Sequence, residues 1–174
     1  MTKTIAILST VLVTFWAAPA RAQHEDGTPC AGQEHDKQQA AAAKPLPAPA
    51  QPVVAQYLKI QSALAADSLD GVDAAAHAVV KALADDPNKT LPAAISTHAE
   101  ALGKATNLEA ARTAFKDLSI ALLRYMGGEK IRTGQYQVVY CPMAKANWLQ
   151  TDKTVKNPYH GKEMLTCGQI IGNF

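Results

Sequence analysis

Apolar positions recur with helical spacing between residues 53 and 128. In four successive stretches an apolar residue returns every three or four positions, and polar or turn-forming residues separate the stretches. The breaks fall at 67–71, at 86–88 and near Thr106, and the last stretch ends at Gly127 and Gly128, a pair typical of a helix C-terminus. Four helices with short connections predict an antiparallel, up-and-down four-helix bundle.

Capping residues support two of these helix starts. Thr90 is placed to cap the third helix, and Pro92 would then lie in its first turn, where a missing N–H costs little. Thr106 and Glu109 have the spacing of a capping box that opens the fourth helix.

The helical spacing ends after Gly134. Residues 135–140 alternate loosely and are rich in β-branched and aromatic side chains, which favours a short strand or an extended segment, but no partner strand is evident. We therefore predict an all-α fold, in which an irregular C-terminal tail bearing cysteines and methionines packs on the four-helix bundle.

The N-terminal third of the chain has a different composition. A basic start, an apolar run over 5–18 and the small-residue site ending at Ala22 predict a signal peptide over 1–22, cleaved near Ala22. Residues 23–52 are polar and then rich in proline and alanine, which predicts a disordered tether before a helical domain at 53–174. No second long apolar run follows, so we expect no membrane span in the mature chain and, for a bacterial host, a periplasmic location.

Charge and motifs exclude two function classes. Removing Lys3 and Arg21 with the leader from the 17 basic residues leaves the same number as the 15 acidic residues, which gives no support for nucleic-acid binding. The sequence has no nucleophile elbow, no phosphate-binding glycine loop, no zinc-protease motif and no credible catalytic triad. We therefore do not expect an enzyme.

The chemistry of the chain is concentrated in the tail. Cys141 and Met143 are two residues apart, so in an extended backbone their sulfur atoms point to the same side. Met164 and Cys167 are three apart, which places them on one face of a helical turn. Thiolate and thioether ligands together select soft ions such as Cu(I) and, by extension, Ag(I), whereas zinc would leave the methionines unused.

Histidines supply further candidate ligands. His98 lies on the apolar face of the third predicted helix, and His160 lies in the turn before Met164, so either could complete a metal site with the two cysteines. His24, Cys30 and His35 form a weaker set within the predicted tether, where spaced ligands capture metal only loosely.

Less specific interpretations stand beside the metal site. Cys141 and Cys167 enclose 25 residues and could form a disulfide in an oxidising compartment, where such a bridge contributes about 3–4 kcal/mol. Methionines are more often core filler than ligands, and a histidine on an apolar face is more often hydrogen-bonded within a core.

Several motifs of the tail resemble a known bacterial family. They are Tyr140-Cys-Pro-Met-Ala, Trp148-Leu-Gln, Asn157-Pro-Tyr-x-Gly and Met164-Leu-x-Cys-Gly, and the stretch 108–119 is also similar. The family is an uncharacterised exported helical domain, found alone and at the C-terminus of periplasmic adaptor subunits of RND-type copper and silver efflux systems. The likeness covers about residues 53–171. The segment between Met143 and Trp148 is shorter here than in many relatives, and His160 stands where an aromatic residue is common.

The resemblance implies work in metal resistance outside the cytoplasm. We therefore expect an exported protein that binds Cu(I) or Ag(I) and sequesters the ion or delivers it to an efflux adaptor. Its metal ligands would be Cys141, Met143, Met164 and Cys167, supported by His98 or His160. The alternative is a non-catalytic structural or interaction module closed by a Cys141–Cys167 disulfide.

Overall fold

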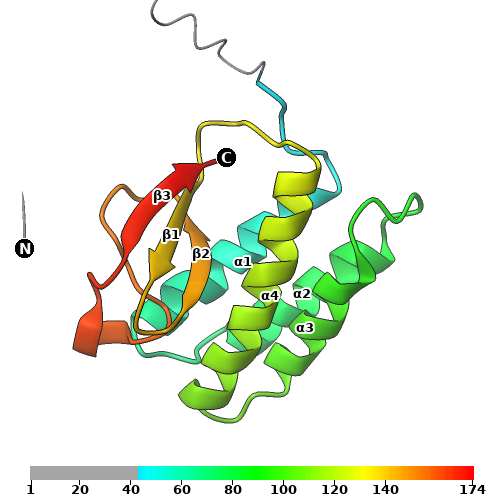
Figure 1. Ribbon diagram of the computed structural model, residues 1–174. Helices are drawn as coiled ribbons and strands as arrows, with labels where there is room; N and C mark the ends of the chain where they lie inside the picture. Colours follow the sequence, from blue (N-terminus) through cyan, green and yellow to red (C-terminus); the bar gives the residue numbers. More distant parts are fainter. Residues whose placement is uncertain (1–42) are drawn as a thin grey trace, which may run out of the picture. The chain divides into compact units, whose positions relative to one another are not determined.

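The computed structural model describes residues 43–174. The predicted signal peptide, its cleavage site and the set of His24, Cys30 and His35 lie outside these residues. Four helices come first, followed by three strands and one short 3-10 helix (Figure 1). The elements are α1 (Ala50–Ala65), α2 (Val72–Ala84), α3 (Ala93–Gly103), α4 (Leu108–Gly128), β1 (Gln137–Cys141), β2 (Ala146–Gln150), η1 (Gly161–Met164) and β3 (Gln169–Asn173).

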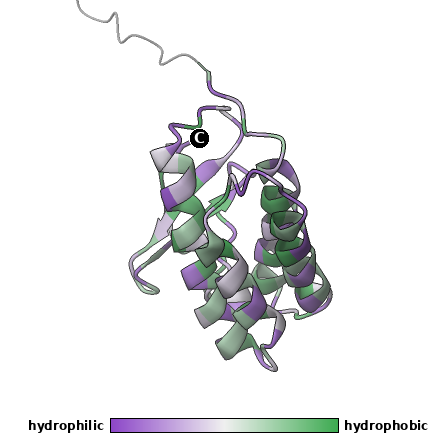
Figure 2. Cartoon of the chain, turned by 90° about the vertical axis from the view of Figure 1, so that its right-hand side faces the viewer, coloured by the Kyte–Doolittle hydropathy of each residue, from purple (hydrophilic) through white to green (hydrophobic). Residues whose placement is uncertain are grey.

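The four predicted helices are all present. Each buries one apolar face, and Figure 2 shows hydrophobic and hydrophilic residues alternating around the helices. On α4 the buried positions recur every three or four residues, at Ala111, Phe115, Leu118, Leu122, Tyr125 and Met126. In space α2 packs between α1 and α3, and α3 packs on α4.

The helix caps differ from the predicted ones. Asn107, and not Thr106, caps α4, because its side-chain oxygen accepts the N–H of Ala110 at 2.9 Å. Pro92 is the N-cap of α3. The N–H of Thr90 is instead bound by the Asp86 carboxylate, at 2.5 Å, which organises the turn between α2 and α3.

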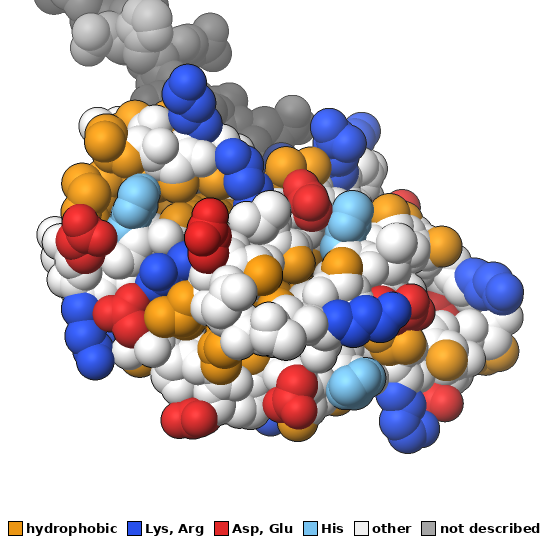
Figure 3. Space-filling model, turned by 90° about the horizontal axis from the view of Figure 1, so that it is seen from below, with side chains coloured by type: hydrophobic (Ala, Val, Ile, Leu, Met, Phe, Trp, Pro, Cys, Tyr) orange, Lys and Arg blue, Asp and Glu red, His pale blue; other side chains and the backbone are white. Residues whose placement is uncertain are grey.

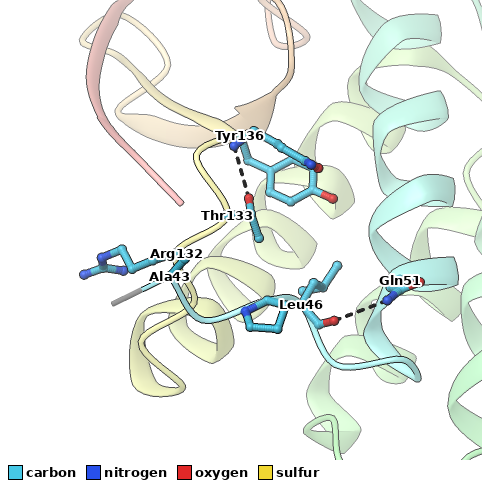
Figure 4. Close-up of a pocket in the computed structure, with 8 residues that line it drawn as sticks. Ala43, Leu46, Gln51, Arg132, Thr133 and Tyr136 are labelled. Carbon is cyan, nitrogen blue, oxygen red and sulfur yellow. Dashed lines mark hydrogen bonds between the residues drawn. The ribbon is translucent and has the colours of Figure 1, made fainter. Parts of the chain in front are cut away.

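The structured region also begins earlier than residue 53. Helix α1 starts at Ala50, and Leu46 is buried in the core. The backbone carbonyl of Lys44 accepts the N–H of Arg132, at 2.9 Å, just beyond α4. Figure 4 shows this segment forming one wall of a cavity of about 460 Å³, with Thr133 and Tyr136 on the other. A buried leucine, a backbone hydrogen bond and the Lys44–Glu129 ion pair therefore hold this part of the proline-rich stretch.

The C-terminal tail is a sheet, so the prediction of an all-α fold with an irregular tail is wrong for this part. The three antiparallel strands have the order β2-β1-β3. Trp148, Leu149 and Gln150 of β2 are buried in succession, while every residue of β3 is exposed. Neither strand therefore shows the alternation by which a strand is recognised in a sequence.

Aromatic side chains join the sheet to the helices. The Tyr57 ring of α1 stacks on Phe115 of α4 at 4.9 Å between centroids, and Phe115 meets Tyr159 at 5.9 Å. Tyr159 in turn contacts Trp148 of β2 edge-on, at 5.7 Å. Each such pair contributes about 0.5–1.5 kcal/mol beyond the area it buries. The tail is thus anchored by the same core that holds α1 to α4.

The charged groups of the described residues are well mixed on the face drawn in Figure 3. Acidic and basic side chains lie among one another there, with hydrophobic side chains between them. Among the helices of residues 43–174, none combines the length and apolar character needed to cross a membrane.

Candidate functional site

Cys141 is the last residue of β1 and lies in the protein core. Its side chain is 0% exposed, like that of Val139 two residues earlier, because alternate residues of a strand share a face. The strand ends in a tight turn to β2, in which Lys145 has a φ of 48°. The N–H of Ala144 in this turn donates to the Cys141 sulfur, at 3.4 Å.

Cys167 lies next to Cys141 and belongs to the loop just before β3. Gly168 follows it with a φ of 151°, and a Cβ there would lie 2.8 Å from the Trp148 ring and 3.1 Å from Val139. Only glycine permits this close approach of the chain to β1. Cys167 is half-buried, so this residue is more accessible to solvent than Cys141.

The two sulfur atoms lie 3.5 Å apart, and both cysteines are free thiols. Burial acts to raise the pKa of Cys141, but hydrogen bonds from the Ala144 N–H and from Cys167 outweigh it, so this pKa lies below its usual value. The hydrogen bond to Cys141, with burial, raises the pKa of Cys167. Of the two thiols, Cys141 therefore has the lower pKa.

Asn157 fixes the loop that carries Cys167. It is fully buried, and its side-chain amide donates to the Cys167 carbonyl at 2.6 Å. Its side-chain oxygen accepts the N–H groups of Tyr159 and His160, at 2.8 and 3.2 Å. One side chain thus joins two segments of the tail, a role that the Asn-Pro-Tyr motif in the sequence does not reveal.

Gln150 performs a similar task at the end of β2. Its side-chain oxygen accepts the indole N–H of Trp148 at 3.0 Å and the N–H of Lys156 at 3.1 Å. Its amide group donates to the carbonyls of Asp152 and Thr154, at 2.6 and 2.8 Å. The Trp-Leu-Gln motif therefore closes the loop after β2 and holds the Trp148 ring in place.

An ion pair ties the tail to the helices. Arg112 of α4 binds the Asp67 carboxylate at 2.5 Å and donates to the Pro158 carbonyl at 3.0 Å. Hydrogen bonds from the Lys162 N–H and from Arg112 lower the pKa of Asp67. A Cβ at Gly161, where φ is 55°, would lie 1.7 Å from the Asp67 oxygen, so this position requires glycine.

The methionines differ in their access to the thiol pair. Met164 ends η1 and is half-buried, and its carbonyl accepts the Cys167 N–H at 2.9 Å. Met143 lies in the turn after β1 with 64% of its surface exposed. The backbone of Met164 is therefore joined to that of Cys167, whereas the Met143 side chain lies largely in solvent.

The histidines do not join the cysteines. His98 borders a groove between α3 and α4, and α3 contacts α2 and α4 but none of the strands, so His98 lies apart from the two cysteines. The Nε2 atom of His160 is buried without a hydrogen-bond partner in residues 43–174, beside a groove that Lys116 and Ala144 also line. Within the same residues, no group of three or more His, Cys, Asp or Glu side chains is arranged to hold a metal ion.

Comparison with known proteins identifies only the helical part. Residues 53–133 match the model of a family described as a protein of unknown function, DUF3347. This agrees with the resemblance to an uncharacterised family. The matched segment includes most of α1 and all of α2 to α4 but stops before β1, so the thiol pair lies outside it. No curated protein and no solved structure matches the chain.

Proposed function

We propose that this protein is an exported binding protein for a soft metal ion, Cu(I) or Ag(I), with Cys141 and Cys167 as principal ligands. The observation that supports the proposal is the 3.5 Å separation of two free thiols at one edge of a well-packed core. Thiolates are preferred ligands of soft ions. Two sulfur atoms held this close can both bind one ion with little rearrangement.

The sulfur separation favours a bent arrangement of the two ligands. With metal–sulfur bonds of about 2.3 Å, two thiolates lie about 3.8 Å apart on a tetrahedral ion and about 4.6 Å apart on a linear one. The observed 3.5 Å is closer to the first value. A bent pair leaves room for a further ligand, and the thioether of Met164 is the side chain best placed to supply it.

The remaining candidates contribute less. The exposed Met143 would have to fold back over the turn to reach the ion. His160 would require a shift of its loop, because it forms no group with the two cysteines. His98 is assigned no role, since α4 lies between its helix and the sheet.

Sequestration of the ion, or its delivery to an efflux adaptor, is the role that we propose in the cell. It follows from the similarity of the tail motifs to a domain that occurs on copper and silver efflux adaptors. The predicted signal peptide would carry the protein to the periplasm, where such adaptors work. In this role the protein needs no catalytic group, and it releases its ion by ligand exchange.

A second candidate function rests on the same sulfur contact. In an oxidising compartment two thiols 3.5 Å apart are well placed to form a disulfide, which needs the sulfurs to approach to about 2.05 Å. The protein would then be a structural or interaction module without metal. Its mass, measured after isolation from its own compartment, would be two hydrogens lower, and elemental analysis would find no copper or silver.

The test of the metal proposal is an anaerobic titration with Cu(I) against a coloured Cu(I) chelator. The full chain should carry Cys30→Ser, so that the third thiol does not contribute. We expect one ion per chain and a loss of affinity of at least about 100-fold in Cys141→Ser or Cys167→Ser, because each removes a direct ligand. Stoichiometric binding that survives Cys141→Ser would refute the assignment.

Two matched pairs of variants refine this test. Met164→Leu should weaken Cu(I) binding more than Met143→Leu, because only the first side chain lies in the turn that bears Cys167. His98→Ala should leave the affinity unchanged and serves as the control for His160→Ala. A loss of affinity for Met164→Leu no larger than that for Met143→Leu would contradict the preference for Met164.

A further inference from the structure

The two sulfur atoms are in contact but differ in their access to solvent. Cys141 is 0% exposed at the end of β1, whereas Cys167 is half-buried in the loop before β3. A large thiol reagent can therefore approach the pair only from the side of Cys167. Binding of a small metal ion does not use this difference, since both ligands act together.

We infer that Cys141 and Cys167 form a thiol–disulfide exchange site, in which outside thiols attack Cys167 and Cys141 is the sulfur that leaves and returns. The partner class is a low-molecular-weight or protein thiol. This activity goes beyond metal binding and does not depend on it.

The exchange can be written as two balanced steps from the oxidised pair. An outside thiolate attacks the Cys167 sulfur, forms a mixed disulfide with it and breaks its bond to Cys141, which leaves as a thiolate. A second outside thiolate then attacks the outside sulfur of the mixed disulfide and releases the Cys167 thiolate. The pair gains two electrons, and the two outside thiols are oxidised to one disulfide.

Local structure favours Cys141 as the leaving sulfur. The N–H of Ala144 already points at it, at 3.4 Å, and would stabilise the negative charge that develops there. Lys116 of α4 holds the carbonyl of the same residue at 2.9 Å, so the turn is fixed before the reaction. The attacked residue is fixed as well, because Asn157 binds the Cys167 carbonyl at 2.6 Å.

The two sides of the site therefore have separate tasks. The buried side supplies a preorganised pocket for a sulfur anion, and the exposed side supplies the sulfur that meets the partner. Exchange and metal binding exclude one another, because the disulfide has no thiolate to offer. Oxidation would release a bound ion, and reduction would restore the site.

Single-cysteine variants test the direction of the exchange. Cys30→Ser/Cys141→Ser and Cys30→Ser/Cys167→Ser, both as full chains and without metal, are incubated with oxidised glutathione, and the mixed disulfide is followed by mass. The adduct on Cys167 should form at least about tenfold faster than that on Cys141, because the buried thiol reacts only after local opening. Equal rates, or a faster reaction at Cys141, would overturn the inference.

A second measurement keeps both cysteines. The Cys30→Ser chain, fully reduced, is treated with less than one equivalent of iodoacetamide and mapped by peptide, and the label should be found on Cys167. The same chain, oxidised and then exposed to reduced glutathione, should regain two thiols. Failure to regain them overturns the exchange site but leaves the anaerobic Cu(I) titration unaffected, so the two proposals fail separately.

Discussion

Two buried tyrosines should respond in opposite ways to loss of the hydroxyl group. Tyr57 is 1% exposed and Tyr125 is 6% exposed, so a change to phenylalanine removes one buried oxygen in each case. The Tyr57 hydroxyl accepts the N–H of Leu149 at 3.1 Å and lies 2.8 Å from the Ser119 hydroxyl. The Tyr125 hydroxyl has no hydrogen-bond partner within residues 43–174.

The change in the free energy of unfolding depends on which buried groups each substitution leaves without a hydrogen-bond partner. Tyr57→Phe leaves the buried N–H of Leu149 unpaired, which costs about 1–3 kcal/mol. Ser119 also loses its contact with Tyr57, but this loss adds less to the cost, because the Ser119 hydroxyl can rotate and donate to a carbonyl of its own helix. Tyr125→Phe removes an unpaired polar atom from the interior, so it should be neutral or stabilising by up to about 1 kcal/mol. The two variants should therefore differ by about 1–4 kcal/mol.

Urea denaturation of the two variants, with thermal unfolding beside it, measures the difference. Tyr57→Phe should lower the urea midpoint without changing the slope and should lower Tm by about 5–10 °C for a domain of this size. Tyr125→Phe should keep the Tm of the parent or raise it. Equal destabilisation by both changes would refute the reasoning, because it would mean that ring packing, and not the bond to Leu149, carries the effect.

Three further predictions concern the joints that hold the tail. Gly161→Ala should lower the stability by at least about 2 kcal/mol in denaturant titrations, since a Cβ would strike Asp67 at a positive φ; a loss below about 0.5 kcal/mol would contradict this. Asn157→Ala should speed iodoacetamide labelling of Cys167 in the Cys30→Ser chain, because the hydrogen bond from Asn157 to the Cys167 carbonyl is lost. An unchanged labelling rate would show that Asn157 does not hold Cys167 in place. Burial raises the pKa of Tyr57 and of Tyr159, so both stay protonated in the folded state while the unfolded chain loses these protons above its ordinary pKa of about 10. Stability should therefore be constant below that pH and fall above it by about 3 kcal/mol per pH unit, and a flat profile in alkaline urea titrations would count against the burial of these phenols.

The two proposals for Cys141 and Cys167 make different demands on the same pair of sulfur atoms. Cys141 belongs to a strand and Cys167 to a loop clamped by Asn157, so the first is rigid while the second sits beside the surface. A metal pair and a disulfide each require a sulfur separation that differs from the 3.5 Å of the thiol contact.

The sequence by itself determined the four helices and singled out the candidate residues of the tail. Helical periodicity is a local property, so it is visible at positions such as Phe115, Leu118 and Leu122 without knowledge of their neighbours in space. The signal that ends helix α4, the glycine pair Gly127 and Gly128, is equally local. Cysteine and methionine stand out for their chemistry alone, and this gave Cys141, Cys167 and Met164 as candidates.

Tertiary structure alone decided the sheet and the composition of the site. Strand pairing depends on residues far apart in the chain, and the alternation that would signal it is lost where β2 is buried on both faces and β3 on neither. The same holds for His98, whose helix is apolar on one side but faces α4 and not the tail. Asn157 and Gln150 look like ordinary polar residues in the sequence, and they become structural only because the folded chain brings buried carbonyl and N–H groups to them.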